Sequence, residues 1–272
     1  MCTPFRALTE IGTAITNTAE RLHVPFAADA RSIVRRGQVR THPIWRDPGV
    51  DTAGLPIVLV GGLLTASPVL LSVLREWLHR IGCRTVLAPT GLGVDCGEAS
   101  VRIVAETARD LAEATGTPPV LLGYSRGGQL SRAVAVRHPE LVRGLITLGS
   151  PLRSDLRDVH PLLRLQVFAL GTMGTLGAPG VFGVRCLWGS CCERLRADII
   201  GPFPAAVPFL SVYSRNDEMV GWRASLDPSA RHHEVTTSHG GLVTDPDVFT
   251  ALASELGELS DGLTGDATEL VA

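Results

Sequence analysis

A serine flanked by glycines is the feature of this sequence best suited to chemistry. Residues 123–127 read G-x-S-x-G around Ser125 and follow an apolar run at 120–122, which is the nucleophile-elbow pattern. In that pattern a sharp strand-to-helix turn holds the serine hydroxyl clear of the sheet, and glycines leave room for the strand and helix on either side. Glycine-rich chains also show the pattern by chance, so an ordinary surface serine in such a turn stays the alternative.

A base and an orienting carboxylate are the next requirements of serine chemistry. His239, in Ser-His-Gly-Gly, comes just past the last predicted strand, and Asp217 follows the strand before it. Strand ends of this kind share the sheet edge where ligand sites of open α/β sheets form. The predicted triad is therefore Ser125, Asp217 and His239, in the chain order serine, acid, histidine. Weaker alternatives are His138, His232, His233, Glu218, Asp198 and Asp227.

An oxyanion hole requires two backbone N–H groups aimed at the reacting carbonyl oxygen. One is expected from Arg126, directly after the serine. The other is expected from Leu63, in the loop after the first central strand, where Gly62 gives the backbone freedom to turn.

Composition excludes several other classes of function. The chain has 272 residues, 45% hydrophobic and 19% charged, which is typical of one globular domain and leaves room for an inserted cap. A net charge of −2 argues against a nucleic-acid partner. All 25 basic residues are arginines, so Ser–Lys dyads, Schiff bases and Walker-type phosphate loops are excluded. We expect a small-molecule ester or acyl substrate, with no cofactor and no metal; the sequence does not indicate an oligomeric state.

Membrane insertion and export are not expected from the sequence. The longest apolar run, 57–74, contains Gly61, Gly62 and Pro68, so strand, loop and helix account for it better than a membrane span does. The N-terminus lacks the apolar core of a signal peptide. A cytoplasmic protein without a transmembrane segment is the resulting prediction.

Stretches with strand and helix character alternate along most of the chain, which predicts an α/β fold. The expected architecture is a mostly parallel central sheet with helices on both faces. Predicted strands are 57–60, 84–88, 120–122, 208–213 and 233–236, with a further strand that ends in a turn at 144–151. Predicted helices begin near Ser67, Ser100, Arg126 and Pro246. The domain plan is an N-terminal helical segment (1–40), an α/β core (41–151 and 208–256), an inserted cap (152–207) and a disordered tail (257–272).

The cap is predicted to form the wall of the substrate site. It has apolar residues but no clear strand or long-helix periodicity, and its central glycines argue against a rigid local fold. We expect some of these residues to wall an apolar acyl pocket above Ser125, and the segment 171–183 to move when substrate enters. The alternative is that they simply pack on the core. The apolar residues are Leu162, Leu163, Leu165, Val167, Phe168, Leu170, Leu176, Val181, Phe182, Leu187 and Trp188; the predicted pocket consists of Leu64, Tyr124, Leu176, Phe182 and Trp188.

Three of the six cysteines fall in the cap. Cys186, Cys191 and Cys192 are close in sequence, and a disulfide among them, with Cys96 as a further partner, is one hypothesis. Reduced buried thiols are the alternative. Zinc is disfavoured because Cys-x4-Cys-Cys lacks the usual paired ligand spacing.

Taken together, the motifs resemble an α/β-hydrolase, and in particular the lipase- and esterase-like serine hydrolases of actinobacteria. The matching segments are 61–64, 123–127, 148–151, 213–220 and 238–241. The resemblance implies Ser125 as nucleophile, Asp217 as acid, His239 as base, and Leu63 and Arg126 as oxyanion donors. Many such enzymes have His-Gly in the oxyanion loop, where this chain has Gly61. The cap cysteines and Cys96 also resemble a recurring feature of an actinobacterial subgroup.

The resulting functional hypothesis is a serine hydrolase that cleaves carboxylic esters with an apolar acyl group through an acyl-serine. An acyltransferase or thioesterase could use the same acyl-serine, since the cap and not the triad selects the acceptor. A non-catalytic ligand-binding protein on the same fold is a third alternative, because fold alone does not fix function.

Overall fold

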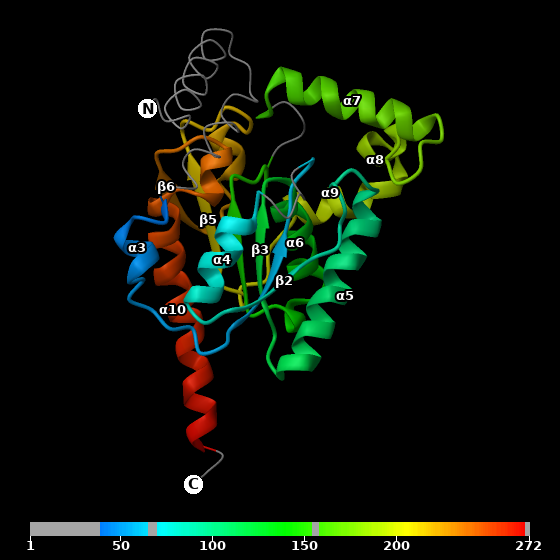
Figure 1. Ribbon diagram of the computed structural model, residues 1–272. Coiled ribbons are helices and arrows are strands. Elements are labelled where there is room, and N and C mark those ends of the chain that lie inside the picture. Colours follow the sequence, from blue (N-terminus) through cyan, green and yellow to red (C-terminus); the bar gives the residue numbers. More distant parts are fainter. Residues whose placement is uncertain (1–38, 65–69, 154–157, 270–272) are drawn as a thin grey trace, which may run out of the picture.

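The computed structural model describes residues 39–64, 70–153 and 158–269, and these surround one parallel sheet (Figure 1). The sheet has six strands in the order β2-β1-β3-β4-β5-β6, and all neighbouring strands are parallel. This confirms the predicted α/β class. In chain order the strands are β1 (Pro56–Val60), β2 (Arg84–Leu87), β3 (Val120–Tyr124), β4 (Gly144–Leu148), β5 (Phe209–Ser214) and β6 (Arg231–Val235).

Helices cover both faces of the sheet, as the alternating pattern predicted (Figure 1). They are α3 (Pro43–Arg46), α4 (Ser72–Arg80), α5 (Gly97–Thr115), α6 (Arg126–Arg137) and α10 (Pro246–Glu269), with short 3-10 turns at Pro139–Leu141, Trp222–Ser225 and Gly240–Val243.

Strand side chains alternate between two hydrophobic cores, because successive residues of a strand point to opposite faces. Ile57 and Leu59 of β1 pack in one core with residues of α4 and α10. Val58 and Val60 of the same strand pack in the other core with α5 and α6. Strands buried on both faces are uniformly apolar, which is why they could be located from the sequence.

The C-terminal helix differs from the prediction. Helix α10 continues to Glu269 instead of ending near Leu256, so residues 257–269 of the predicted disordered tail are helical. The added turns have a partner in the core, since Leu259 is buried and its carbonyl accepts a hydrogen bond from Arg143 Nε at 2.7 Å. Of the predicted N-terminal helical segment (1–40), residues 1–38 lie outside the described residues, as does the predicted helix start near Ser67.

The cap lies between β4 and β5 in the chain, beyond one end of the sheet (Figure 1). Its described part contains α7 (Pro161–Thr175), α8 (Val184–Trp188), a 3-10 turn (Ser190–Cys192) and α9 (Glu193–Ile200). Although the cap sequence has no clear long-helix periodicity, α7 has 15 residues. A side chain at Gly174 would clash with the carbonyls of Val181 and Phe182. The glycine therefore lets the chain that returns after α7 pack closely on this helix. None of the described helices has the length and hydropathy that a membrane span requires.

Candidate active site

Ser125 occupies a strained turn between β3 and α6. Its backbone has φ 54° and ψ −124°, one of the positive-φ conformations found outside glycine in the described residues. The N–H of Ser125 donates to Leu148 O at 2.9 Å, which ties the turn to β4. A Cβ on Gly123 would lie 2.5 Å from Gly128 Cα, and one on Gly127 would clash with the carbonyl oxygen of Val60. Both glycines of the motif are therefore required, because neighbouring backbone lies too close to leave room for a side chain.

The sheet order places Ser125 beside the loop that follows β1. Strand order changes direction between β1 and β3, and open α/β sheets bind ligands at such a point. Ser125 follows β3 and Leu63 follows β1, and both line one cavity. Arg126 is the first residue of α6, where backbone N–H groups have no intrahelical partner. Leu64, at φ 56°, donates its N–H to Leu92 O at 2.7 Å and fixes the loop after Leu63.

Asp217 and His239 form a buried hydrogen-bonded pair. Asp217 Oδ2 lies 2.7 Å from His239 Nδ1, and the two side chains are only 2% and 7% exposed. The other oxygen of Asp217 accepts the backbone N–H groups of Met219 at 2.9 Å and Val220 at 2.8 Å. The carboxylate is therefore oriented by its own turn and in turn orients the imidazole.

Tyr124, which precedes Ser125, and the end of β4 connect Ser125 to the Asp217–His239 pair. Tyr124 donates its hydroxyl to the carbonyl oxygen of His239 at 3.2 Å, and the two rings lie 5.0 Å apart. At the end of β4, a Cβ on Gly149 would lie 3.0 Å from Asp217 Oδ2 and 3.2 Å from His239 Nδ1. Gly149 directly follows Leu148, whose carbonyl holds Ser125. The elbow and the acid–histidine pair thus share the carboxyl ends of β3 and β4.

The alternative acids have other partners. Asp227 pairs with Arg132 at 2.7 Å and Asp198 with Arg137 at 2.6 Å. Glu218 accepts the backbone N–H of His239 at 3.2 Å, and burial raises the pKa of its carboxyl group. Among the alternative histidines, His138 lies beside Glu140, while His232 and His233 belong to β6.

A cavity of about 720 Å³ lies between Ser125 and the cap. Its wall is mainly apolar, with residues from α7, α8 and α9 facing Leu63 and Ser125 of the sheet edge. Of the predicted pocket residues, Phe182 and Trp188 line it; Leu64 and Leu176 are 44% and 83% exposed, and Tyr124 is buried beneath it. The cap residues that line the cavity include Val159, Leu163, Val167, Phe182, Leu187, Trp188, Leu195 and Ile199.

Comparisons with known proteins agree with this fold. The family model described as alpha/beta hydrolase fold matches residues 88–177, which include the elbow. Solved structures with the same arrangement include a metagenomic carboxyl esterase, MGS0156, at 20% identity and TM-score 0.56, covering 76% of this chain and 72% of that one. This chain has the α/β-hydrolase fold.

Two further solved α/β-hydrolase structures resemble the chain. The Bacillus licheniformis lipase BlEst2 is 19% identical at TM-score 0.57, with 76% of this chain and 94% of the lipase covered. The Paleococcus ferrophilus monoacylglycerol lipase is 16% identical at TM-score 0.55, with 77% and 96% covered. No curated protein sequence matches the chain. The likeness to actinobacterial enzymes stays a prediction.

A second side-chain cluster of this α/β-hydrolase fold brings together the four cysteines that the sequence grouped as possible disulfide partners. Cys96 comes from the start of α5, yet its sulfur lies beside those of Cys186, Cys191 and Cys192 of the cap. The predicted cap disulfide is absent from the described residues, where these cysteines are all thiols. The spacing of the cap cysteines argued against a zinc site, but that spacing omits Cys96, which is separated from Cys191 by 95 positions.

Arg132 was also missed. It lies on the buried side of α6 with an exposed fraction of only 2%, and it contacts both Asp227 and the cap. Its sequence signal is an arginine in an otherwise apolar stretch, between Leu130 and Ala133.

Proposed function

We propose that this protein is a carboxylic ester hydrolase that acts through an acyl-enzyme on Ser125. The observation that carries the proposal is the strained Ser125 in the wall of an apolar cavity, beside the ends of the strands that hold the Asp217–His239 pair. A non-glycine residue keeps such a conformation only where its surroundings impose it, and such strain clusters at functional sites.

In the first half-reaction, Ser125 Oγ attacks the ester carbonyl and His239 takes the hydroxyl proton. The carbonyl oxygen becomes an oxyanion, which the backbone N–H groups of Leu63 and Arg126 stabilise. The helix dipole of α6 favours the same negative charge. As the C–O bond breaks, His239 returns the proton to the departing alcohol, and an acyl-serine remains.

In the second half-reaction, His239 takes a proton from water, whose oxygen attacks the acyl carbonyl. Collapse of this second oxyanion breaks the bond to Ser125 Oγ, which regains its proton from His239, and the carboxylic acid leaves. Asp217 stays ionised throughout, since its role is to hold the imidazole tautomer and stabilise the imidazolium.

The substrate class is proposed from the cavity wall and the structural neighbours. The neighbours are described as a carboxyl esterase, a lipase and a monoacylglycerol lipase. The apolar side chains of α7 and α8 that face Ser125 suit an acyl chain better than a charged group. Each methylene buried there contributes up to about 0.8 kcal/mol, or about fourfold in kcat/KM.

Labelling with a fluorophosphonate probe tests the nucleophile. The wild-type protein should be labelled once, at Ser125, and should hydrolyse p-nitrophenyl esters. Ser125→Ala should lose both properties with an unchanged thermal transition, and Ser229→Ala, an exposed serine, should keep both. His239→Ala should lower kcat about 10⁴- to 10⁶-fold, since triad members act as a unit. Esterase activity that survives in Ser125→Ala would refute the proposal.

The acid is tested by charge removal at three positions. Asp217→Asn should lower kcat about 10⁴-fold, because the imidazole loses its orienting charge. Asp198→Asn and Asp227→Asn, which remove carboxylates paired with arginines, should retain far more kcat per folded molecule. The opposite ranking would assign the acid elsewhere.

Acyl-chain length tests the substrate class. With p-nitrophenyl esters, kcat/KM should rise over short chains and level off where the cavity ends. Leu163→Trp fills the cavity and should move that limit to shorter chains; the matched variant Leu176→Trp, at a cap residue that is 83% exposed, should not. Rates independent of chain length would exclude an acyl pocket while leaving the acyl-serine mechanism intact.

A further inference from the structure

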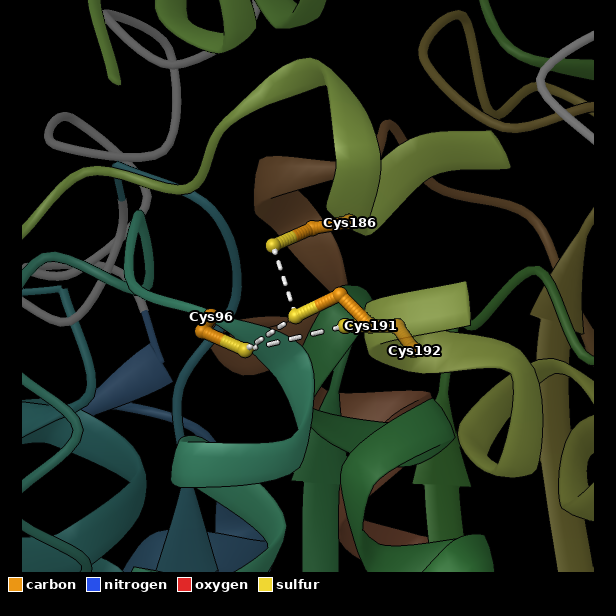
Figure 2. A group of neighbouring side chains, drawn as sticks. All are labelled: Cys96, Cys186, Cys191 and Cys192. Atoms are coloured by element: carbon orange, nitrogen blue, oxygen red, sulfur yellow. Dashed lines mark hydrogen bonds between the residues drawn. The ribbon is translucent and has the colours of Figure 1, made fainter. Parts of the chain in front are cut away.

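Four cysteine sulfurs meet where the cap contacts the body of the domain (Figure 2). Cys96 is the residue before the first turn of α5, Cys186 belongs to α8, and Cys191 and Cys192 belong to the 3-10 turn before α9. Figure 2 shows the side chains converging from these separate backbone segments. Three of them come from the cap and one from the sheet-covering helix.

The distances among the sulfurs fit a tetrahedron. Cys191 Sγ lies 3.6 Å from both Cys96 Sγ and Cys186 Sγ, and Cys96 Sγ lies 3.7 Å from Cys192 Sγ. All four atoms lie within 4.8 Å of one another. Four thiolates around one zinc ion at about 2.3 Å would be separated by about 3.8 Å along each edge. Only small side-chain movements separate the observed cluster from that arrangement.

Backbone N–H groups at the start of α5 point at two of the sulfurs. The Cys96 sulfur accepts hydrogen bonds from the backbone N–H groups of Ala99 and Glu98. The Glu98 N–H also hydrogen-bonds the Cys192 sulfur. These N–H groups belong to the first turn of α5, the positive end of a 19-residue helix.

A cation lies next to the cluster as well. A Cβ built on Gly97 would be 3.5 Å from Cys192 Sγ and 3.7 Å from Arg126 Nη2, so the sulfur and the guanidinium flank the same glycine. Arg126 is fixed there by hydrogen bonds to the carbonyls of Gly93 and Asp95. Four thiolates and one Zn²⁺ carry a net charge of −2, which Arg126 and the start of α5 would partly balance.

We propose that Cys96, Cys186, Cys191 and Cys192 bind one Zn²⁺ ion in a closed structural site. Binding converts four thiols to four thiolates with release of four protons, and no electron is transferred. Thiolate ligands in tetrahedral geometry select zinc over the hard cations Mg²⁺ and Ca²⁺. With four protein ligands, no position remains for water or substrate, so this zinc would not take part in ester cleavage.

The site would attach the cap to the domain body. Segment 184–192 exposes much of its surface, including Trp188 at 56% exposure, so burial alone holds it weakly. The metal would tie this segment to the start of α5, close to Arg126 beside the nucleophile. The cavity wall includes Cys186 and Cys192, so the same link would define one side of the cavity.

Two disulfides explain the cluster less well. A disulfide joins sulfurs in pairs, whereas Cys191 contacts both Cys96 and Cys186, and Cys96 contacts both Cys191 and Cys192. The contacts form one connected set, as a shared central ligand requires. This inference does not depend on the proposed esterase activity.

Metal analysis of the full-length protein tests the site directly. After expression with zinc in the medium and removal of any affinity tag, we expect about one zinc per chain. X-ray absorption should show about four sulfur neighbours at about 2.3 Å. Iron in place of zinc, no bound metal, or zinc with nitrogen and oxygen ligands would overturn the proposal. A mass of the unreduced protein that is lower by two hydrogens for each disulfide formed would also overturn the proposal.

Single substitutions assign the ligands. Cys96→Ser and Cys191→Ser should each retain far less zinc, whereas Cys83→Ala, which removes a buried thiol hydrogen-bonded to Thr52 outside the cluster, should retain it fully. If a cluster variant does not fold, the test uses the wild-type protein instead, from which a chelator removes the zinc. Zinc removal should then increase hydrogen exchange in 184–200 without changing exchange in β1 and β3. Equal exchange in 184–200 with and without zinc would refute the attachment role.

Discussion

The sheet and the cap of this molecule are held together in different ways. Every residue of β1, β3 and β4 is buried, so the centre of the sheet is stabilised by apolar area removed from water. In α7 of the cap only Val167 and Gly171 are buried, and large apolar side chains such as Leu165 and Met173 are exposed. The cap cannot be stabilised by burial to the same extent.

Helix α9 of the cap buries Leu195 and Ile199 in the core beside α5 and α6, and specific polar groups add to its contact with the domain body. Arg132 of α6 donates to the carbonyls of Asp198 and Gly201, and Arg137 of the same helix pairs with Asp198. Glu98 of α5 accepts the backbone N–H of Leu195 at 2.8 Å. Where stability depends on a few directed contacts, one substitution can remove a large share of it. In a large apolar core, one substitution removes only a small share of the total free energy of unfolding.

The largest effect should follow removal of the buried arginine. Arg132→Met would leave Asp227 ionised and unpaired at 2% exposure, at a cost of about 3–5 kcal/mol in the free energy of unfolding. It would also remove the two contacts to α9, so that the cap loosens as well. Urea denaturation with hydrogen exchange would measure both effects.

Its matched control is Arg215→Met. That arginine pairs with Glu234 at the surface, where both side chains are more than 40% exposed, and its loss should leave the urea midpoint unchanged. If both variants unfold at the wild-type urea concentration, the buried Arg132–Asp227 pair does not stabilise the folded protein.

A pair of glycine substitutions compares the two regions directly. In both Gly127→Ala and Gly174→Ala the new methyl group would meet a backbone carbonyl, of Val60 in the sheet or of Phe182 in the cap. Gly127→Ala should lower the global free energy of unfolding by about 1–3 kcal/mol, because the elbow cannot move without the sheet.

Gly174→Ala should leave the global transition nearly unchanged and instead speed hydrogen exchange in 161–188, since the cap can open by itself. Equal shifts of the thermal midpoint in the two variants would mean that cap and sheet unfold as one unit.

The same contrast explains what the sequence could predict. Strand positions are set by local apolar runs, so all six strands were placed within about two residues. Asp217 and His239 were located because strand ends of a parallel sheet share one edge. The central glycines of the cap argued against a rigid local fold, yet Gly174 lies in α7, where it lets the returning chain pack at Phe182. Leu176 was wrongly placed in the pocket because nothing local indicates that it points outward.

Glu98 gives the smallest predicted effect and a test by pH. Its carboxylate receives Arg137 Nη1 at 2.7 Å and Nη2 at 3.0 Å, and these hydrogen bonds lower the pKa of Glu98 from its ordinary value of 4.5. The unfolded chain therefore binds this proton more readily than the folded protein. The resulting stabilisation is complete above the unfolded pKa and is lost as pH falls through the lowered folded pKa.

Glu98→Gln keeps an acceptor for Leu195 but removes the charge, so it should cost about 1 kcal/mol near neutral pH. Urea midpoints of wild type and variant should differ at about pH 7 and converge below about pH 4.5, where the unfolded carboxyl group takes up its proton. Glu140→Gln, at a side chain that is 67% exposed, should show no such convergence. A difference in urea midpoint that stays constant across this pH range would mean that Glu98 supports α9 through shape and hydrogen bonding rather than through its charge. The cap would then depend less on electrostatics than its arginine contacts indicate.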